Sequence, residues 1–215
     1  MKREIRFFFN VVLILCAGTG IELNFQKLNI VMSLSAFTMQ SNLLCLIMAA
    51  VTLVYVIKKT IPCGRFYIFF KGMSLVSILL TFFVYNLVLK PYIDVTDEAF
   101  SKSLNSILLH VAVPLMMLGD FLFFEVKGYF KTWYPFAWAA FPIFYIVYTA
   151  VYKALGGVYN FVGDTVVNFP YFFLDYETYG YKTVGIWLLF IVIGFIGFSY
   201  LLVGLDKLFA RRAKR

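Results

Sequence analysis

The chain has 215 residues, of which 62% are hydrophobic and only 14% are charged. A soluble domain carries about 25% charged residues, so this composition indicates an integral membrane protein. The net charge of +8 at pH 7 does not indicate nucleic-acid binding, because the basic residues stand at the ends of apolar runs and form no single patch.

Six apolar runs follow one another along the chain, and each is long enough to cross roughly 30 Å of hydrocarbon as a helix. They cover residues 7–23, 30–57, 66–89, 104–126, 134–152 and 183–209. The first run follows Lys2, Arg3 and Arg6 but has no convincing cleavage site, so we expect a retained helix and not a secretory signal. The predicted fold class is all-α, with a single transmembrane bundle of six helices over residues 1–215.

Charged residues near the ends of these runs are expected to face water or the lipid headgroups. Lys71 lies near the start of the third run, from which its long side chain can reach the interface. An acidic loop over 94–98 separates the third and fourth runs, and a longer loop over 153–182 separates the fifth and sixth.

The distribution of basic residues predicts the orientation of the bundle. Fourteen of the 19 lysines and arginines fall at the N-terminus, in the loops after the second and fourth runs, and at the C-terminus. The positive-inside rule therefore places both termini in the cytoplasm, which an even number of spans also requires. The expected localisation is the cell membrane, as a multi-pass protein in contact with membrane lipids.

A cluster of polar residues interrupts the second run. On a helix, five small or polar side chains share one face: Ser35, Thr38, Ser41, Asn42 and Cys45. Polar side chains inside a membrane are costly, so such a cluster is a candidate site. The same residue types are also common at helix–helix contacts, where they bind backbone carbonyls, and that alternative stays open.

The histidine in the fourth run, His110, is a second candidate and the only one in the chain. With both termini inside, Thr38 lies roughly 12 Å and His110 roughly 9 Å below the outer face at 1.5 Å per residue. Matched depths allow the hydroxyl and the imidazole to meet as a nucleophile and its general base. Pro114 lacks an N–H and leaves the carbonyl of His110 without its helical donor. A hydrogen-bonded structural histidine is the alternative interpretation.

Other residues complete or limit this hypothesis. Asn42 and Ser41 share the face of Thr38 and are candidates for binding the ester or its oxyanion. Asp120 lies ten residues beyond His110, roughly 15 Å along the helix, which is too far for a direct partner. We expect Asp120 near the inner interface, solvated or paired with Lys127 or Lys131. A lone histidine with three scattered cysteines predicts neither a metal site nor a haem site, and we expect no cofactor.

Three segments of the chain resemble the androgen-induced protein family, in particular its prokaryotic six-span relatives. They are Ala-Phe-Thr-Met-Gln-Ser-Asn at 36–42, Leu-His-Val-Ala-Val-Pro at 109–114 and Tyr-Phe-Phe-Leu-Asp at 171–175. The family pattern has proline where Phe172 stands here. The resemblance implies an intramembrane hydrolase with a threonine nucleophile and a histidine, which by motif correspond to Thr38 and His110. It also implies fatty acid esters of hydroxy fatty acids as substrates.

Two functions therefore compete at the level of the sequence. The first is an intramembrane lipid-ester hydrolase that uses Thr38 and His110. The second is a non-catalytic lipid-binding protein or small transporter, in which the same polar groups hold a lipid headgroup. No inverted repeat, which would favour a transporter, is evident in the sequence.

Overall fold

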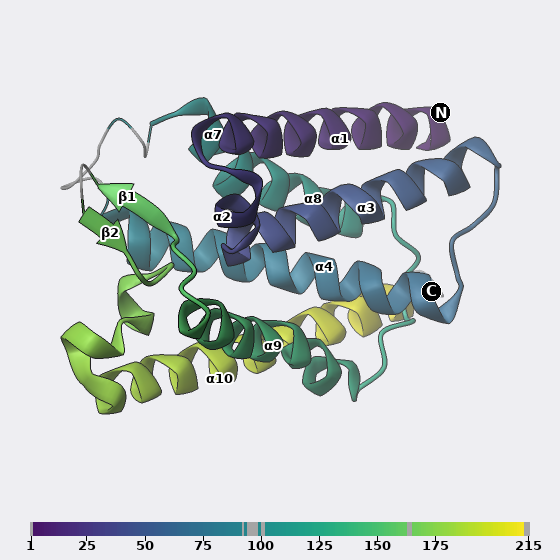
Figure 1. Cartoon of the computed structure of the whole chain (residues 1–215). Coiled ribbons are helices and arrows are strands. Elements are labelled where there is room, and N and C mark those ends of the chain that lie inside the picture. Colours follow the sequence, from purple (N-terminus) through teal and green to yellow (C-terminus); the bar gives the residue numbers. More distant parts are fainter. Residues whose placement is uncertain (1, 92, 94–98, 100–101, 163–164, 213–215) are drawn as a thin grey trace.

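The structure is a computed structural model that describes residues 2–91, 93, 99, 102–162 and 165–212 (Figure 1). Six of its helical segments are long and apolar enough to cross a membrane, which confirms the predicted helical class and the number of long apolar helices. They are Lys2–Lys27, Phe37–Ile57, Arg65–Leu89, Leu104–Phe123, Tyr134–Ala154 and Tyr176–Arg212. The predicted acidic loop over 94–98 and the last basic residues, Lys214 and Arg215, lie outside the described residues.

The sequence predicts one continuous helix for the second apolar run, but the structure divides it into two. A short helix α2 (Ile30–Leu34) ends at Ser35, and α3 (Phe37–Ile57) begins after Ala36, whose backbone is extended at φ −86° and ψ 139°. The Ser35 hydroxyl donates to the carbonyl of Met32 at 2.6 Å and so supports the break. Thr38 therefore stands in the first turn of a helix, where backbone N–H groups lack intrahelical acceptors.

Two of the spans contain a widened, π-helical turn. The third span consists of α4 (Arg65–Val84) followed by the π-turn η1 (Tyr85–Leu89). The fourth consists of α7 (Leu104–Ile107), the π-turn η2 (Leu108–Ala112) and α8 (Val113–Phe123). Turns of this kind are rare in proteins, and those that occur are often found at functional sites. His110 lies in the second of them, just before Pro114.

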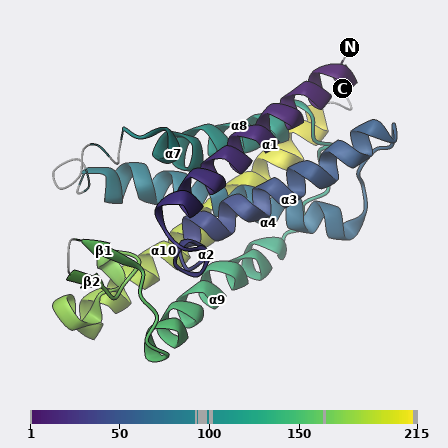
Figure 2. The same cartoon turned by 45° about the horizontal axis from the view of Figure 1, so that its top comes forward.

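The loop between the fifth and sixth spans is more ordered than predicted. After α9 (Tyr134–Ala154), the strands β1 (Asn160–Val162) and β2 (Thr165–Val167) pair antiparallel, with Asn160 opposite Val167. The 3-10 turn η3 (Phe172–Leu174) follows, and α10 (Tyr176–Arg212) begins about two turns earlier than expected. Gly180 has φ 77° inside α10 and bends its first turn away from the long span. The loop thereby folds over the end of the bundle where α2 lies (Figures 1 and 2).

The core of the bundle forms where α4 meets its neighbours. Trp138 of α9 is fully buried, and its indole N–H donates to the carbonyl of Phe69 at 3.0 Å. A Cβ added to Gly72 would lie only 2.2 Å from the Trp138 ring, so glycine is what allows α4 and α9 to pack here. The described ends of the first and last helices lie at the same end of the bundle, opposite the hairpin (Figure 2).

Candidate functional site

Thr38 and His110 lie side by side, as their matched depths predicted. Thr38 Oγ1, at the start of α3, is 3.4 Å from His110 Nε2 on the π-turn η2. His110 is only 7% exposed and Thr38 is half-buried, so the pair is largely shielded. A distance of 3.4 Å is a long hydrogen bond, within the looseness expected of a catalytic pair without substrate.

The other ring nitrogen of His110 determines which nitrogen carries the proton. His110 Nδ1 lies 3.0 Å from the backbone carbonyl of Ser106, four residues earlier. A carbonyl oxygen can only accept, so this contact assigns the proton to Nδ1 and leaves the lone pair of Nε2 facing Thr38. Tyr85 stacks on the imidazole with ring centroids 3.7 Å apart and bonds to the Ser106 hydroxyl at 2.5 Å. The imidazole is therefore fixed in position and in a tautomer suited to a base.

Two asparagine amides bind the carbonyls that the helix leaves open near Pro114. Asn86 Nδ2, from η1, donates to the carbonyl of His110 at 3.3 Å. Asn42 Nδ2, from α3, donates to the carbonyl of Leu109 at 3.1 Å and to that of Thr38 at 2.8 Å. The bond from Asn42 to Leu109 connects α3, which carries Thr38, to η2, which carries His110. The open carbonyl of His110 follows from the proline, as the sequence predicted.

Ser41 and Asn42, the candidates for binding the oxyanion, take part in structural contacts instead of facing a cavity. Ser41 Oγ is 3.0 Å from the Thr38 carbonyl and 2.9 Å from the Thr81 hydroxyl. Both side chains are fully buried, and neither lines the cavities that reach Thr38. Their position suits them to hold Thr38 in place and not to contact a substrate.

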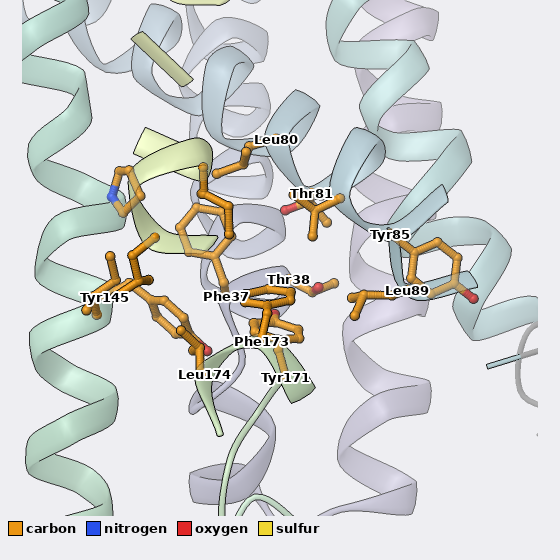
Figure 3. A pocket seen from close by; sticks show the side chains of 15 residues that line it. Phe37, Thr38, Leu80, Thr81, Tyr85, Leu89, Tyr145, Tyr171, Phe173 and Leu174 are labelled. Carbon is orange, nitrogen blue, oxygen red and sulfur yellow. The ribbon is translucent and has the colours of Figure 1, made fainter. Parts of the chain in front are cut away.

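Thr38 stands where two cavities meet. The larger, of about 920 Å³, lies under the hairpin loop and includes His110 and the polar side chains of Asn24, Asn105 and Asp175 among its lining residues. The smaller, of about 50 Å³, is almost wholly apolar and extends between α4, α9 and α10 (Figure 3). Thr38, Tyr85, Leu89 and Tyr171 line both cavities. A molecule bound at Thr38 can therefore place a polar part on one side and an apolar part on the other.

Tyr171, from the loop before η3, covers the first turn of α3 beside Thr38 (Figure 3). Burial raises the pKa of its hydroxyl, while the hydroxyl and backbone amide of Thr38 and the backbone amide of Phe37 lower it to a smaller extent. The hydroxyl thus stays protonated at neutral pH and lies next to the N–H groups at the helix start. These are hydrogen-bond donors close to the nucleophile.

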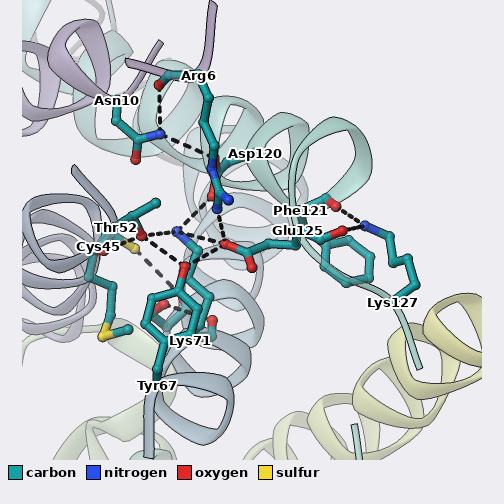
Figure 4. Close-up of polar contacts among 12 residues, drawn as sticks. Arg6, Asn10, Cys45, Thr52, Tyr67, Lys71, Asp120, Phe121, Glu125 and Lys127 are labelled. Carbon is teal, nitrogen blue, oxygen red and sulfur yellow. Dashed lines mark hydrogen bonds and ion pairs between the residues drawn. The ribbon is translucent and has the colours of Figure 1, made fainter. Parts of the chain in front are cut away.

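Asp120 belongs to a separate cluster, and here two expectations were wrong. Its carboxylate is fully buried and lies 2.8 Å from Lys71 Nζ and 3.5 Å from Arg6 Nε, so it is neither solvated nor paired with Lys127 or Lys131 (Figure 4). Lys71 is only 4% exposed, so its side chain turns into the bundle and not outward as expected. Burial without a partner would cost several kcal/mol per ion, so the lysine turns inward to the carboxylate.

Glu125 extends the same cluster. It pairs with Arg6, accepts a hydrogen bond from the Tyr67 hydroxyl at 2.6 Å and lies 3.9 Å from Lys71 (Figure 4). The two acidic and two basic side chains balance in charge. They come from α1, α4, α8 and the segment after α8, and they lie towards the end of the bundle where the chain begins.

Comparisons with protein-family models, curated proteins and solved structures find no match to this chain. A function must therefore be argued from the residues of the site. Sequence reasoning missed Tyr85, Ser106, Asn86 and the positioning of Tyr171. Of these, only Ser106 left a direct signal, because a residue four positions before His110 on a helix lies on the same face.

Proposed function

We propose that this protein is an intramembrane hydrolase that cleaves lipid esters with Thr38 as the nucleophile and His110 as the general base. The observation that carries the proposal is the 3.4 Å contact between Thr38 Oγ1 and the unprotonated Nε2 of a histidine whose Nδ1 is bound to a carbonyl. A structural threonine in a membrane helix commonly bonds its own helix backbone. Thr38 instead faces an imidazole at the junction of two cavities.

In the proposed reaction, Thr38 Oγ1 attacks the ester carbonyl carbon as its proton passes to His110 Nε2. The tetrahedral intermediate collapses when the C–O bond to the alcohol breaks, and the leaving alcohol takes the proton from His110. Water then attacks the acyl-threonine, again with His110 as the base, and releases the fatty acid with Thr38 restored. The donors that we propose for the oxyanion are the N–H groups of the first turn of α3, with the Tyr171 hydroxyl beside them. Asn42 and Ser41 act here as positioning residues.

The resemblance to the androgen-induced protein family supports the same two residues in the same roles. It also favours fatty acid esters of hydroxy fatty acids as the substrates. A membrane-embedded site with one polar and one apolar cavity suits an ester of this class. The alternative is a protein that binds or transports lipids without cleaving them. Such a function does not require His110 to be protonated at Nδ1 or to contact Thr38.

Covalent labelling tests the nucleophile directly. Purified protein in detergent should react with an alkyl fluorophosphonate that carries a long chain, and the modified peptide should contain Thr38. We expect Thr38→Ala to abolish labelling and His110→Ala to slow it by about 10²- to 10⁴-fold, the usual contribution of a general base.

The matched control for this experiment is Thr149→Ala. Thr149 is a buried threonine of α9 that bonds its own helix at the Ile146 carbonyl, and it lines neither cavity at Thr38. The control should label as the wild type does. Labelling that is equal in wild type and Thr38→Ala would favour the lipid-binding alternative.

We further propose that both termini face the cytoplasm, as the 14 basic residues on that side indicate. A fluorescent protein fused after Arg215 should then mature inside the cell. A phosphatase inserted after Gly156, in an exposed turn between α9 and β1, should be active outside it. Phosphatase activity at the C-terminus would overturn the orientation and with it the assignment of the site to the outer leaflet.

A further inference from the structure

An apolar groove of about 240 Å³ lies between α4 and α10. It extends along the third span from Val76 to Val88 and along α10 from Phe190 to Phe198, and every side chain that lines it is a hydrocarbon or an aromatic ring. Leu87 is 71% exposed and Phe190 is 69% exposed, so the groove is open to the exterior of the bundle. For spans in a bilayer, that exterior is the hydrocarbon of the lipids.

The groove adjoins the largely apolar cavity at Thr38. Leu80, Val84 and Ile191 line both, so these apolar side chains stand between the exterior of the bundle and the cavity that reaches the nucleophile. From Val76 to Val88 the third span rises roughly 18 Å at 1.5 Å per residue. One leaflet of a bilayer has a hydrocarbon depth of about 15 Å. The groove therefore has the length and the chemistry of one lipid tail.

We propose that this groove binds the acyl chain of the ester, which enters sideways from the membrane between α4 and α10 and places its carbonyl at Thr38. This inference rests on the proposed function and adds the orientation of the substrate. The alcohol part then lies in the larger cavity, where Asn24, Asn105 and Asp175 offer polar partners. After the first step, the acyl chain stays in the groove on Thr38, and the alcohol leaves through the cavity by which water enters.

Gly194 offers a way to block the groove. It lines the groove from α10, and a Cβ added there would meet no atom within 4 Å. Gly194→Leu therefore adds bulk to the groove from a position where the new Cβ has room. The matched control is Gly204→Leu on the same helix, where an added Cβ also meets nothing within 4 Å and which does not line the groove.

The first measurement is the chain-length preference of the purified enzyme, taken as the ratio of kcat/KM for a 4-nitrophenyl ester of palmitate to that of acetate. Each methylene displaced from the groove costs roughly fourfold, so Gly194→Leu should lower this ratio by more than about tenfold if it displaces two. Gly204→Leu should leave the ratio as in wild type. An unchanged ratio in Gly194→Leu would overturn the proposal even if the protein is an active hydrolase.

The second measurement does not depend on turnover. Thr38→Ala protein in lipid nanodiscs is photolysed with a palmitate analogue that has a diazirine at mid-chain, and cross-linked peptides are identified by mass spectrometry. Cross-links should concentrate at 76–88 and 190–198 and decrease when Gly194→Leu is added. Cross-links spread evenly over the outer faces of all the helices would refute the groove. Concentrated cross-links in a protein that cleaves no ester would instead retain the groove and refute the hydrolase.

Discussion

Thr38→Ala is expected to abolish ester hydrolysis while the protein keeps its fold. Loss of one member of a hydrolase catalytic unit lowers the rate on the order of 10⁴- to 10⁶-fold. The hydroxyl contributes little to stability, because a hydrogen bond between membrane helices averages about 0.6 kcal/mol. Purified variants in detergent would be assayed with a chromogenic short-chain ester and with a fatty acid ester of a hydroxy fatty acid. Thermal unfolding of the same samples would be followed by circular dichroism.

Thr38→Ser refines this test. Serine keeps the hydroxyl at the start of α3 and removes only the methyl group, so the variant should retain a measurable fraction of activity. Thr149→Ala, the buried threonine away from both cavities, should retain nearly full activity. A purely structural Thr38 would give a different pattern, in which Thr38→Ala is slightly less stable and cleaves both esters at the rate of the wild type.

Much of the site could be predicted from the sequence because depth in a membrane is a one-dimensional quantity. A predicted orientation and a rise of 1.5 Å per residue place Thr38 and His110 at one level. Pro114 indicates where the backbone is open. The two residues indeed lie 3.4 Å apart.

The features of the site that the sequence did not predict are the helix break and the contacts of individual side chains. The break at Ser35 and Ala36 falls inside an apolar run and has no proline or glycine to mark it. Ser41 and Asn42 were assigned to the cavity because they follow Thr38 on α3, but they contact Thr81 and the carbonyl of Leu109 on neighbouring helices. The tautomer of His110 depends on a carbonyl of its own helix, and the stacked Tyr85 comes from another span. The contact with Ser106 is local to one helix, whereas the stacking of Tyr85 arises from tertiary packing, which periodicity does not encode.

The cluster of buried charges shows the same limit more strongly. Arg6 and Lys71 lie near the ends of apolar runs, where basic residues ordinarily mark orientation or reach the headgroups. In the structure both turn inward to Asp120, which the sequence had assigned to the interface. Their partners come from different helices, so only the assembled bundle brings them together.

This cluster leads to the largest expected effect on stability. Lys71→Met leaves Asp120 and Glu125 buried with Arg6 as their only remaining cationic partner within the described residues. Loss of one partner from a buried ion pair costs about 3–5 kcal/mol, because the remaining charge is buried without compensation. The free energy of unfolding would be measured by denaturant titration in detergent. Lys207→Met, at an exposed lysine on α10, is the control and should change this free energy by less than about 0.5 kcal/mol.

The double variant Lys71→Met with Asp120→Leu then separates two explanations of the cluster. If these charges serve only to compensate one another, the double variant should recover much of the stability lost in each single variant, since apolar side chains often replace a buried ion pair without loss. The double variant should then lose less stability than the sum of the two single losses, by the 0.5–3 kcal/mol or so typical of contacting residues. Activity at Thr38 should follow stability in all three variants, because the cluster contributes no lining residue to the cavities at Thr38. A double variant that is stable but inactive would instead indicate that the charges take part in the function of the bundle, as ionisable residues inside membranes often do.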